Sequence, residues 1–384
     1  MAVAISVAST TSKSFSTNRI HIMPSTIQSD LINISQTETA GARSPARFAY
    51  QRNWALAELI EYHLKGKDYV FAFEFHDDIL ILDSEEDPSN LQFVQVKTKT
   101  TGEKWSVHEL TKSEKGKKGN PDKLSIIGKL YENKKNFAAH SSQLRFVTNA
   151  YFSFVSPAPS IIADQLGKNE QDKIAKAVQA QLGISEVDLS CFKLEQSSLS
   201  VDDHEKHIRG ILHNFFEELF GSEHNIPVSP WYQTISDQIK VKNNYPSDQI
   251  KTFDDLIRNK CITKTEVDDF VRRVNRSHNS SDNWDIIKAQ LKSEGIVLQE
   301  LVKLQRSWQK YTTDRLDYDN DALMSLERDI ANAVSNGSLG DTPFLKEVIS
   351  TVRKNTAKKL SQMESIFDSY YIDSIILWQY CEQL

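Results

Sequence analysis

Two adjacent acids, an amide and a lysine lie close together in the sequence, and together they could support cleavage of a phosphodiester bond. Asp77 and Asp78 directly precede an apolar segment, and Gln95 and Lys97 lie two residues apart near the end of another. Mg²⁺ accepts carboxylate and amide oxygens as ligands, and a neighbouring ammonium offsets the negative charge that develops on a phosphate. Spacing alone is weak evidence, because lysines at strand ends are commonly only solvated.

A pair of antiparallel strands would bring these side chains together. Side chains alternate along a strand, so Gln95 and Lys97 share one face while Val94 and Val96 point to the other. If this strand pairs as a hairpin with the apolar segment 79–82, an acid at the start of that segment meets the amide and the lysine near the end of its partner.

Each of these residues then has an expected role. Asp78 would hold a metal ion, Gln95 would add an amide ligand or an orienting contact, and Lys97 would stabilise the attacking water or the transition state. A shift of one residue in strand register would exchange Asp77 for Asp78 at the site. The sequence therefore leaves open which of the two aspartates binds metal.

The segments around the site predict a helix, three strands, a second helix and a fourth strand. Ser44 and Pro45 are typical of a helix start, and apolar residues at helical spacing continue from there to Gly66. Runs rich in aromatic and branched residues, bounded by turn-forming residues, predict the strands. The predicted ranges are 44–66 for the first helix, 69–75, 79–82 and 91–97 for the strands, 124–137 for the second helix and 144–148 for the fourth strand.

Beyond residue 157 the pattern is mostly helical, and 192–199 is the one further predicted strand. The aromatic segment 370–380 is unusual for a terminus, and its composition is typical of interface cores, which suggests a subunit or partner contact. The loop 278–282 separates two of the predicted helices. These helices cover 173–182, 202–220, 253–258, 265–274, 284–293, 297–311, 321–334 and 343–367.

Length and composition indicate a folded protein of more than one domain. A chain of 384 residues suggests two or three domains at about 150 residues each. The first forty residues contain fourteen Ser or Thr and little hydrophobic periodicity, which favours a flexible arm. We expect a flexible Ser/Thr-rich arm at 1–43, a mixed α/β domain at 44–225 and a mostly α-helical domain at 226–384.

Composition also bears on the compartment and on the partners. The three cysteines form no CxxC pair, which favours a reducing compartment over a disulfide framework or a thiolate zinc site. The apolar runs are too short to cross a bilayer, so no membrane span is expected. The net charge of −6 conceals a basic segment at 97–145, where twelve Lys or Arg face five Asp or Glu.

This basic segment predicts contact with DNA that does not depend on sequence. Lysines beside the proposed site would neutralise phosphates and release counterions. The alternative is a solvated, mobile loop, which is the more common role of a charge run. The candidate DNA-binding residues are Lys99, Lys104, Lys115, Lys117 and Lys118, and Lys129 and Arg145 would extend the track.

Several segments resemble, in matching order, bacterial antiphage double-stranded-DNA endonuclease domains of the PD-(D/E)xK nuclease superfamily. Such domains occur in cyclic-oligonucleotide (CBASS) defence effectors fused to a SAVED sensor, and in proteins that partner HerA-type ATPases. The resemblance implies a restriction-endonuclease-like fold for the α/β domain. It covers about 41–155 and is carried by 46–56, 74–79, 93–99, 125–131 and 145–149.

The resemblance also implies roles for four residues. Asp78 matches the metal-binding acid, Gln95 the (D/E) position and Lys97 the lysine of the motif, while Gln51 falls where related nucleases often place a helix-borne Glu. The implied cofactor is Mg²⁺ or Mn²⁺, with Asp78 and Gln95 as ligands. Two of the four positions are amides, which implies weaker metal binding in the free enzyme and completion of the site by a DNA phosphate.

The predominantly helical second half does not resemble the mixed α/β sequence of a SAVED sensor. We therefore expect the ATPase-partnered branch: a Mg²⁺-dependent endonuclease of low sequence specificity in the bacterial cytoplasm, oligomeric and docked on a HerA-like hexameric ATPase. Two alternatives remain open. One is a non-catalytic DNA-binding or scaffold subunit that keeps the nuclease fold, and the other is a nuclease effector activated by a cyclic oligonucleotide.

Overall fold

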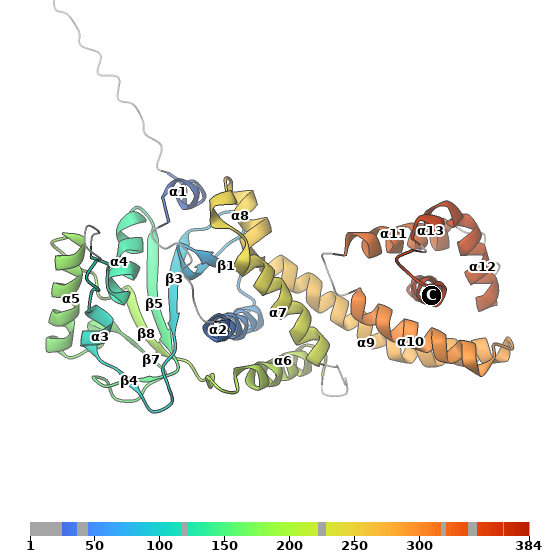
Figure 1. Cartoon of the computed structure of the whole chain (residues 1–384), viewed down its shortest axis with the longest axis horizontal. Helices are drawn as coiled ribbons and strands as arrows, with labels where there is room; N and C mark the ends of the chain where they lie inside the picture. Colours follow the sequence, from blue (N-terminus) through green and yellow to red (C-terminus); the bar gives the residue numbers. More distant parts are fainter. Residues whose placement is uncertain are drawn as a thin grey trace, which may run out of the picture.

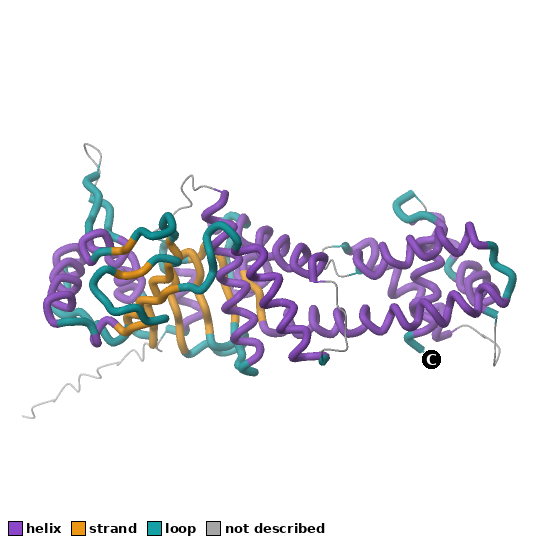
Figure 2. Tube along the Cα trace, turned by 90° about the horizontal axis from the view of Figure 1, so that it is seen from below, coloured by secondary structure: helices purple, strands orange, loops and turns teal. Residues whose placement is uncertain are grey.

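The computed structural model describes residues 25–36, 45–116, 122–221, 228–315, 320–336, 344–363 and 365–383, without the side chains of 45–46 and 276–282. It contains an α/β lobe and a helical lobe that lie side by side, and α9 (Lys264–Ser293) runs from one to the other (Figure 1). The strands are confined to the first lobe (Figure 2). A mixed sheet with helices followed by a helical region confirms the predicted fold class.

The α/β lobe is built on a seven-stranded sheet in the order β7-β8-β5-β3-β2-β1-β9. The central β3 pairs antiparallel with β2 and parallel with β5, so the sheet is mixed. A separate parallel pair, β4 and β6, lies outside it. The strands are β1 (Val70–Phe75), β2 (Asp77–Leu82), β3 (Asn90–Lys97), β4 (Lys104–Trp105), β5 (Ser141–Thr148), β6 (Tyr151–Phe152), β7 (Ser160–Ile162), β8 (Phe192–Gln196) and β9 (Cys261–Thr263).

Helices cover both faces of the sheet, which explains why every residue of β2 is buried. Leu80 and Leu82 belong to the core on one face, and Ile79 and Ile81 to the core on the other. The first face is covered by α1 (Ile27–Asn33), α3 (Val107–Thr111), α4 (Ile126–Asn136), α5 (Lys168–Leu182) and α8 (Phe253–Lys260). The second face is covered by α2 (Pro45–Leu64), α6 (His204–Phe220), α7 (Val228–Asn244) and the start of α9.

The α/β lobe extends beyond both of its predicted boundaries. The segment 1–43, predicted to be a flexible arm, includes α1, which Thr26 caps and which buries Ile27 and Leu31 in the sheet core. The boundary predicted at 225 is also too early, because β9 pairs with β1 at the sheet edge. Both elements are too short to show a clear hydrophobic periodicity in the sequence. They are stabilised by packing against segments that are distant in the chain.

The helical lobe has its own core and differs from the prediction in three places. Helix α9 continues through the predicted loop 278–282, and the predicted helix 343–367 divides at Thr356. The aromatic segment 370–380 packs inside this lobe, where Trp378 is buried against Trp308, and is not left for a partner. The remaining helices are α10 (Leu298–Asp314), α11 (Asp321–Asn336), α12 (Leu345–Asn355), α13 (Ala357–Met363) and α14 (Ser369–Cys381).

Because α1 is packed, its apolar contacts should contribute to stability. We expect Leu31→Ala to lower the free energy of unfolding by about 2–4 kcal/mol, as for other fully buried leucines. The control Asn33→Ala changes an exposed residue of the same helix and should have a much smaller effect. Urea denaturation measures both. Equal stability of the two variants would show that α1 is an unattached arm.

Candidate active site

The β2–β3 hairpin brings the predicted acid and lysine into contact. The register pairs Ile79 with Val94, and one further step sets Asp78 opposite Gln95. The Nζ of Lys97 lies 3.2 Å from Asp78 Oδ2, and the backbone N–H of Val96 donates to the same oxygen at 2.9 Å. The side chain of Asp78 is fully buried, whereas that of Lys97 is 28% exposed. The ammonium therefore lies between a buried carboxylate and solvent.

The two predicted amides lie near the same stretch of β3. Gln95 is buried, and strand alternation places it on the face of Lys97. Gln51, on α2, donates from Nε2 to the carbonyl of Val96 at 3.1 Å. Its buried Oε1 finds no hydrogen-bond partner among the described residues, which is a costly state for an amide oxygen. Asp78 and Gln51 thus meet at the backbone of Val96.

The side chain of Asp77 has different hydrogen-bond partners from the side chain of Asp78. Its Oδ2 accepts a hydrogen bond from Asn133 Nδ2 at 3.1 Å, and its Oδ1 accepts one from the N–H of Asp78 at 2.8 Å. The structure therefore brings Asp78, and not Asp77, to Lys97. Asn133 was not identified from the sequence, although a buried amide in the apolar pattern of α4 was the available signal.

The donor set suits a hard divalent cation. A buried carboxylate, an amide oxygen without a partner and a second buried amide supply oxygen ligands of the kind that Mg²⁺ and Mn²⁺ prefer. In the part of the chain that the structure describes, no group of three or more His, Cys, Asp or Glu side chains could hold a metal. A cation bound here would rely on one carboxylate of the protein, on amide oxygens and on groups from its substrate.

Lys99, predicted to bind DNA, is instead committed to contacts within the protein. Its Nζ donates to the carbonyl of Lys104 at 2.8 Å, forms an ion pair with Glu109 and lies 4.4 Å from the ring centroid of Trp105. The pKa of the Glu109 carboxyl is lowered to about 2. The largest cause is the hydrogen bond from Lys99, and smaller contributions come from the hydroxyl and the backbone N–H of Ser106. Lys99 therefore stabilises the β4–α3 region.

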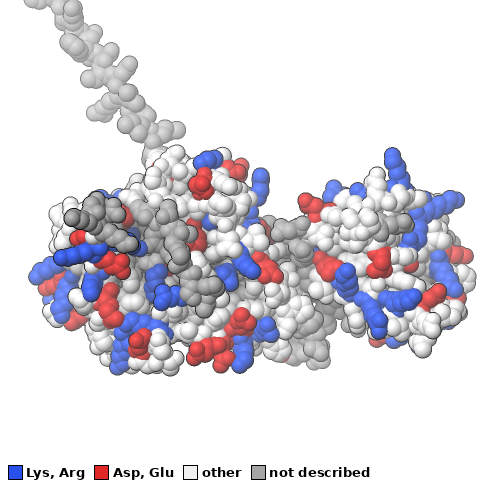
Figure 3. Space-filling view, in the orientation of Figure 1, with Lys and Arg blue, Asp and Glu red and all other residues white. Residues whose placement is uncertain are grey.

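Of the other four predicted DNA-binding lysines, the structure describes two. Lys104 and Lys115 are exposed, as expected for side chains that contact phosphates. Lys117 and Lys118 lie outside the described residues. Acidic and basic side chains are mixed on the face of the α/β lobe shown in Figure 3, so on this view no broad single-sign surface marks a DNA path.

Arg145 does not extend a DNA track, because it is buried in an ion cluster. It is 3% exposed and pairs with Glu58 at 2.6 Å and with Glu195 at 2.5 Å. Burial alone would lower the pKa of Arg145, but the two carboxylates outweigh it and raise that pKa. Arg145 links α2, β5 and β8 and has a structural role.

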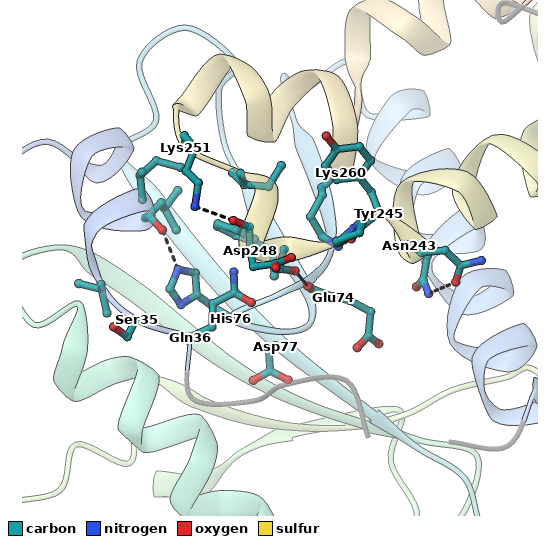
Figure 4. Close-up of a pocket in the computed structure, with 18 of the residues that line it drawn as sticks. Ser35, Gln36, Glu74, His76, Asp77, Asn243, Tyr245, Asp248, Lys251 and Lys260 are labelled. Atoms are coloured by element: carbon teal, nitrogen blue, oxygen red, sulfur yellow. Dashed lines mark hydrogen bonds between the residues drawn. The ribbon is translucent and has the colours of Figure 1, made fainter. Parts of the chain in front are cut away.

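A cavity of about 970 Å³ adjoins the turn that precedes Asp78. Glu74, His76 and Asp77 line one side of it, and Lys251 and Lys260 line another (Figure 4). Lys260 is 1% exposed and donates to the carbonyl of Tyr245 at 2.8 Å, and its burial lowers the pKa of its ammonium to about 8.

Comparison with known proteins identifies the domain that carries this site. The family model described as "Cap4, dsDNA endonuclease domain" matches residues 39–243, more than half of the chain. No curated protein and no solved structure matches the chain. The matched range includes Gln51, Asp78, Gln95 and Lys97, whereas α1 precedes it and the helical lobe follows it.

A separate search of the described residues finds no helix that is long and apolar enough to cross a membrane.

Arg145 is buried and Lys104 is exposed, so substituting each of them tests the structural role assigned to Arg145. We expect Arg145→Met to lower the free energy of unfolding by about 3–5 kcal/mol, because it leaves the mostly buried Glu58 carboxylate without its counter-ion and leaves Glu195 with Lys193 alone. Lys104→Met should change it by less than about 0.5 kcal/mol, as is usual for surface substitutions. Urea denaturation measures both, and similar values would mean that Arg145 is a surface residue.

Proposed function

The chain belongs to the Cap4 dsDNA endonuclease domain family, and we propose that it is a metal-dependent endonuclease of low sequence specificity in a prokaryotic antiphage system. The family confirms the resemblance found in the sequence and implies double-stranded DNA as the substrate. The contact between Lys97 and the buried Asp78 carboxylate supports catalytic competence most directly. It places an ammonium beside a buried carboxylate at one end of the β2–β3 hairpin.

We assign the metal site to Asp78, Gln51 and Gln95. The carboxylate of Asp78 supplies the negative charge, and the Oε1 of Gln51, which has no hydrogen-bond partner among the described residues, supplies an amide oxygen. A bound Mg²⁺ or Mn²⁺ would supply positive charge to the phosphate at the point of cleavage. With a single carboxylate, we expect weak metal binding without DNA.

Lys97 is assigned to the phosphate and the attacking water. Hydrolysis adds water across a P–O bond, and one strand end then carries a phosphomonoester while the other carries a hydroxyl. The negative charge on the phosphate oxygens grows in the transition state, and a preorganised ammonium stabilises it. The partial exposure of Lys97 allows this contact, while Asp78 holds the ammonium in place.

The helical lobe is assigned to assembly. We propose that it joins copies of this chain and docks them on a HerA-like hexameric ATPase in the bacterial cytoplasm. Its separate core allows it to bind a partner without disturbing the sheet. Exposed apolar side chains on this lobe, among them Ile286, Leu298 and Phe344, are of the kind that a protein partner would cover.

A scaffold subunit that has lost catalysis is the second candidate. Gln51 and Gln95 favour it, because the resemblance places both at positions where related nucleases carry a carboxylate. Such a subunit would keep the fold and bind DNA without cutting it.

Plasmid cleavage in Mg²⁺ tests the proposed activity. Asp78→Ala and Lys97→Ala should each lower the rate by about 100-fold or more, because the first removes the carboxylate assigned to the metal and the second removes the ammonium that stabilises negative charge in the transition state. Asp87→Ala, an exposed carboxylate in the β2–β3 turn, is the matched control and should cleave normally. Each protein is assayed with EDTA, and with and without a HerA-type ATPase.

Cleavage that survives in both site variants would contradict the assignment. DNA binding without cleavage under every condition would favour the scaffold candidate, and a rate independent of the ATPase would remove that partner from the proposal.

The exposed lysines should act on DNA affinity through charge alone. Lys104→Gln and Lys115→Gln should each weaken binding and reduce the slope of log affinity against log salt concentration by about 1. Lys168→Gln, an exposed lysine on α5 that the proposal does not use, is the control. Fluorescence anisotropy with a labelled duplex in EDTA measures the slopes, and unchanged slopes would exclude both lysines from the interface.

A further inference from the structure

We propose that Asn133, Asp77 and His76 are positioning residues that fix the direction of the Asp78 carboxylate through the β1–β2 turn. The inference deepens the proposed function, since it assumes that Asp78 binds the metal. The hydrogen bonds that the structure gives for the three side chains lie within this turn or join it to α1 and α4.

The backbone of this turn is unusual. Glu74 and His76 are the only non-glycine residues with positive φ in the described part of the chain, at 48° and 61°. Side chains rarely adopt this left-handed region, and it persists only where the surroundings impose it. Between Phe73 and Phe75 the side chains also change from one sheet face to the other, which breaks the normal alternation. The turn thus sets which aspartate faces Lys97.

Asn133 holds the turn from α4. Its Nδ2 donates both to the carbonyl of His76 at 3.0 Å and to Asp77 Oδ2 at 3.1 Å. Asp77 Oδ1 in turn accepts the N–H of Asp78 at 2.8 Å. These contacts form a continuous chain from the helix to the backbone of Asp78.

The burial of this amide carries a cost that packing alone would not require. Asn133 is 2% exposed, and its Oδ1 has no hydrogen-bond partner among the residues described. An apolar residue of similar size would fill the same space without an unsatisfied acceptor. The two bonds of Nδ2 therefore indicate a role in placing the turn.

His76 ties the turn to α1. Its Nε2 donates to the carbonyl of Leu31 in α1 at 2.9 Å, drawn as the dashed line from His76 in Figure 4. Its ring packs edge-on against Phe137. Helix α1 precedes the residues that match the nuclease family, so this chain supplies the support from its own N-terminal segment. The turn is therefore bonded to both α1 and α4.

The main test is Asn133→Leu, with Asn136→Leu as the control for an exposed asparagine on the same helix. Asn133→Leu removes the unsatisfied acceptor but leaves the His76 carbonyl and Asp77 Oδ2 without the Asn133 donor, so circular dichroism first checks that the variant folds. We expect the dissociation constant for Mn²⁺, measured by electron paramagnetic resonance, to rise about tenfold, as for other residues that orient metal ligands. The kcat should fall by a similar factor, with the KM for DNA unchanged. Asn136→Leu should match the wild type.

A reciprocal exchange keeps the test decisive if Asn133→Leu does not fold. Asp77→Asn alone places a second amide against Asn133. Asp77→Asn combined with Asn133→Asp restores the donor–acceptor pair between the two side chains, although not the bond to the His76 carbonyl, and should recover part of the Mn²⁺ affinity. His76→Asn tolerates positive φ but is too short to reach Leu31, and it should also weaken Mn²⁺ binding.

The possible failures are distinguishable. Wild-type Mn²⁺ affinity and kcat in Asn133→Leu, or no recovery in the exchanged pair, would overturn the positioning role. If Asp78→Ala itself keeps Mn²⁺ binding and cleavage, the proposed function fails instead.

Discussion

A carboxylate can be buried in a protein only where donors replace the water that it loses, and Asp78 meets this requirement at the end of the β2–β3 hairpin. Its Oδ2 accepts the N–H of Val96 and lies within reach of the Lys97 ammonium. Both partners come from β3, so the strand that carries the lysine also fixes the acid. The site depends on this register, because a slip of one residue would turn the lysine away.

The layers around the sheet explain why the register holds. Both faces of β2 and β3 are covered by helices, and alternate side chains belong to different cores. A slipped strand would exchange the two sets and disrupt both cores. Helix α2 packs on one face and brings Gln51 to Val96, while α4 packs on the other and brings Asn133 to the turn. The same helices that stabilise the sheet therefore also assemble the site.

Local pattern predicted the parts of the site that lie on one hairpin. Alternation placed Gln95 and Lys97 on one face, and the hairpin spacing paired them with an acid. The choice between Asp77 and Asp78 could not be made, because it depends on the φ angles of Glu74 and His76.

Contacts between distant segments escaped prediction. Lys99 was expected at DNA, but Glu109 and Trp105 hold it. Arg145 was expected to extend the DNA-binding track, but it pairs with Glu58 and Glu195 inside the fold. In the same way, α1 and β9 are too short to be recognised from the sequence alone. Packing on the sheet stabilises α1, and pairing with β1 stabilises β9.

The most direct test is to locate the metal in a crystal of the protein soaked with Mn²⁺, using anomalous scattering. The account predicts a peak within about 2.2 Å of an Asp78 carboxylate oxygen, with Gln51 Oε1 turned towards it. A peak on Asp77, or full occupancy at a site remote from the β2–β3 hairpin with none at Asp78, would contradict it.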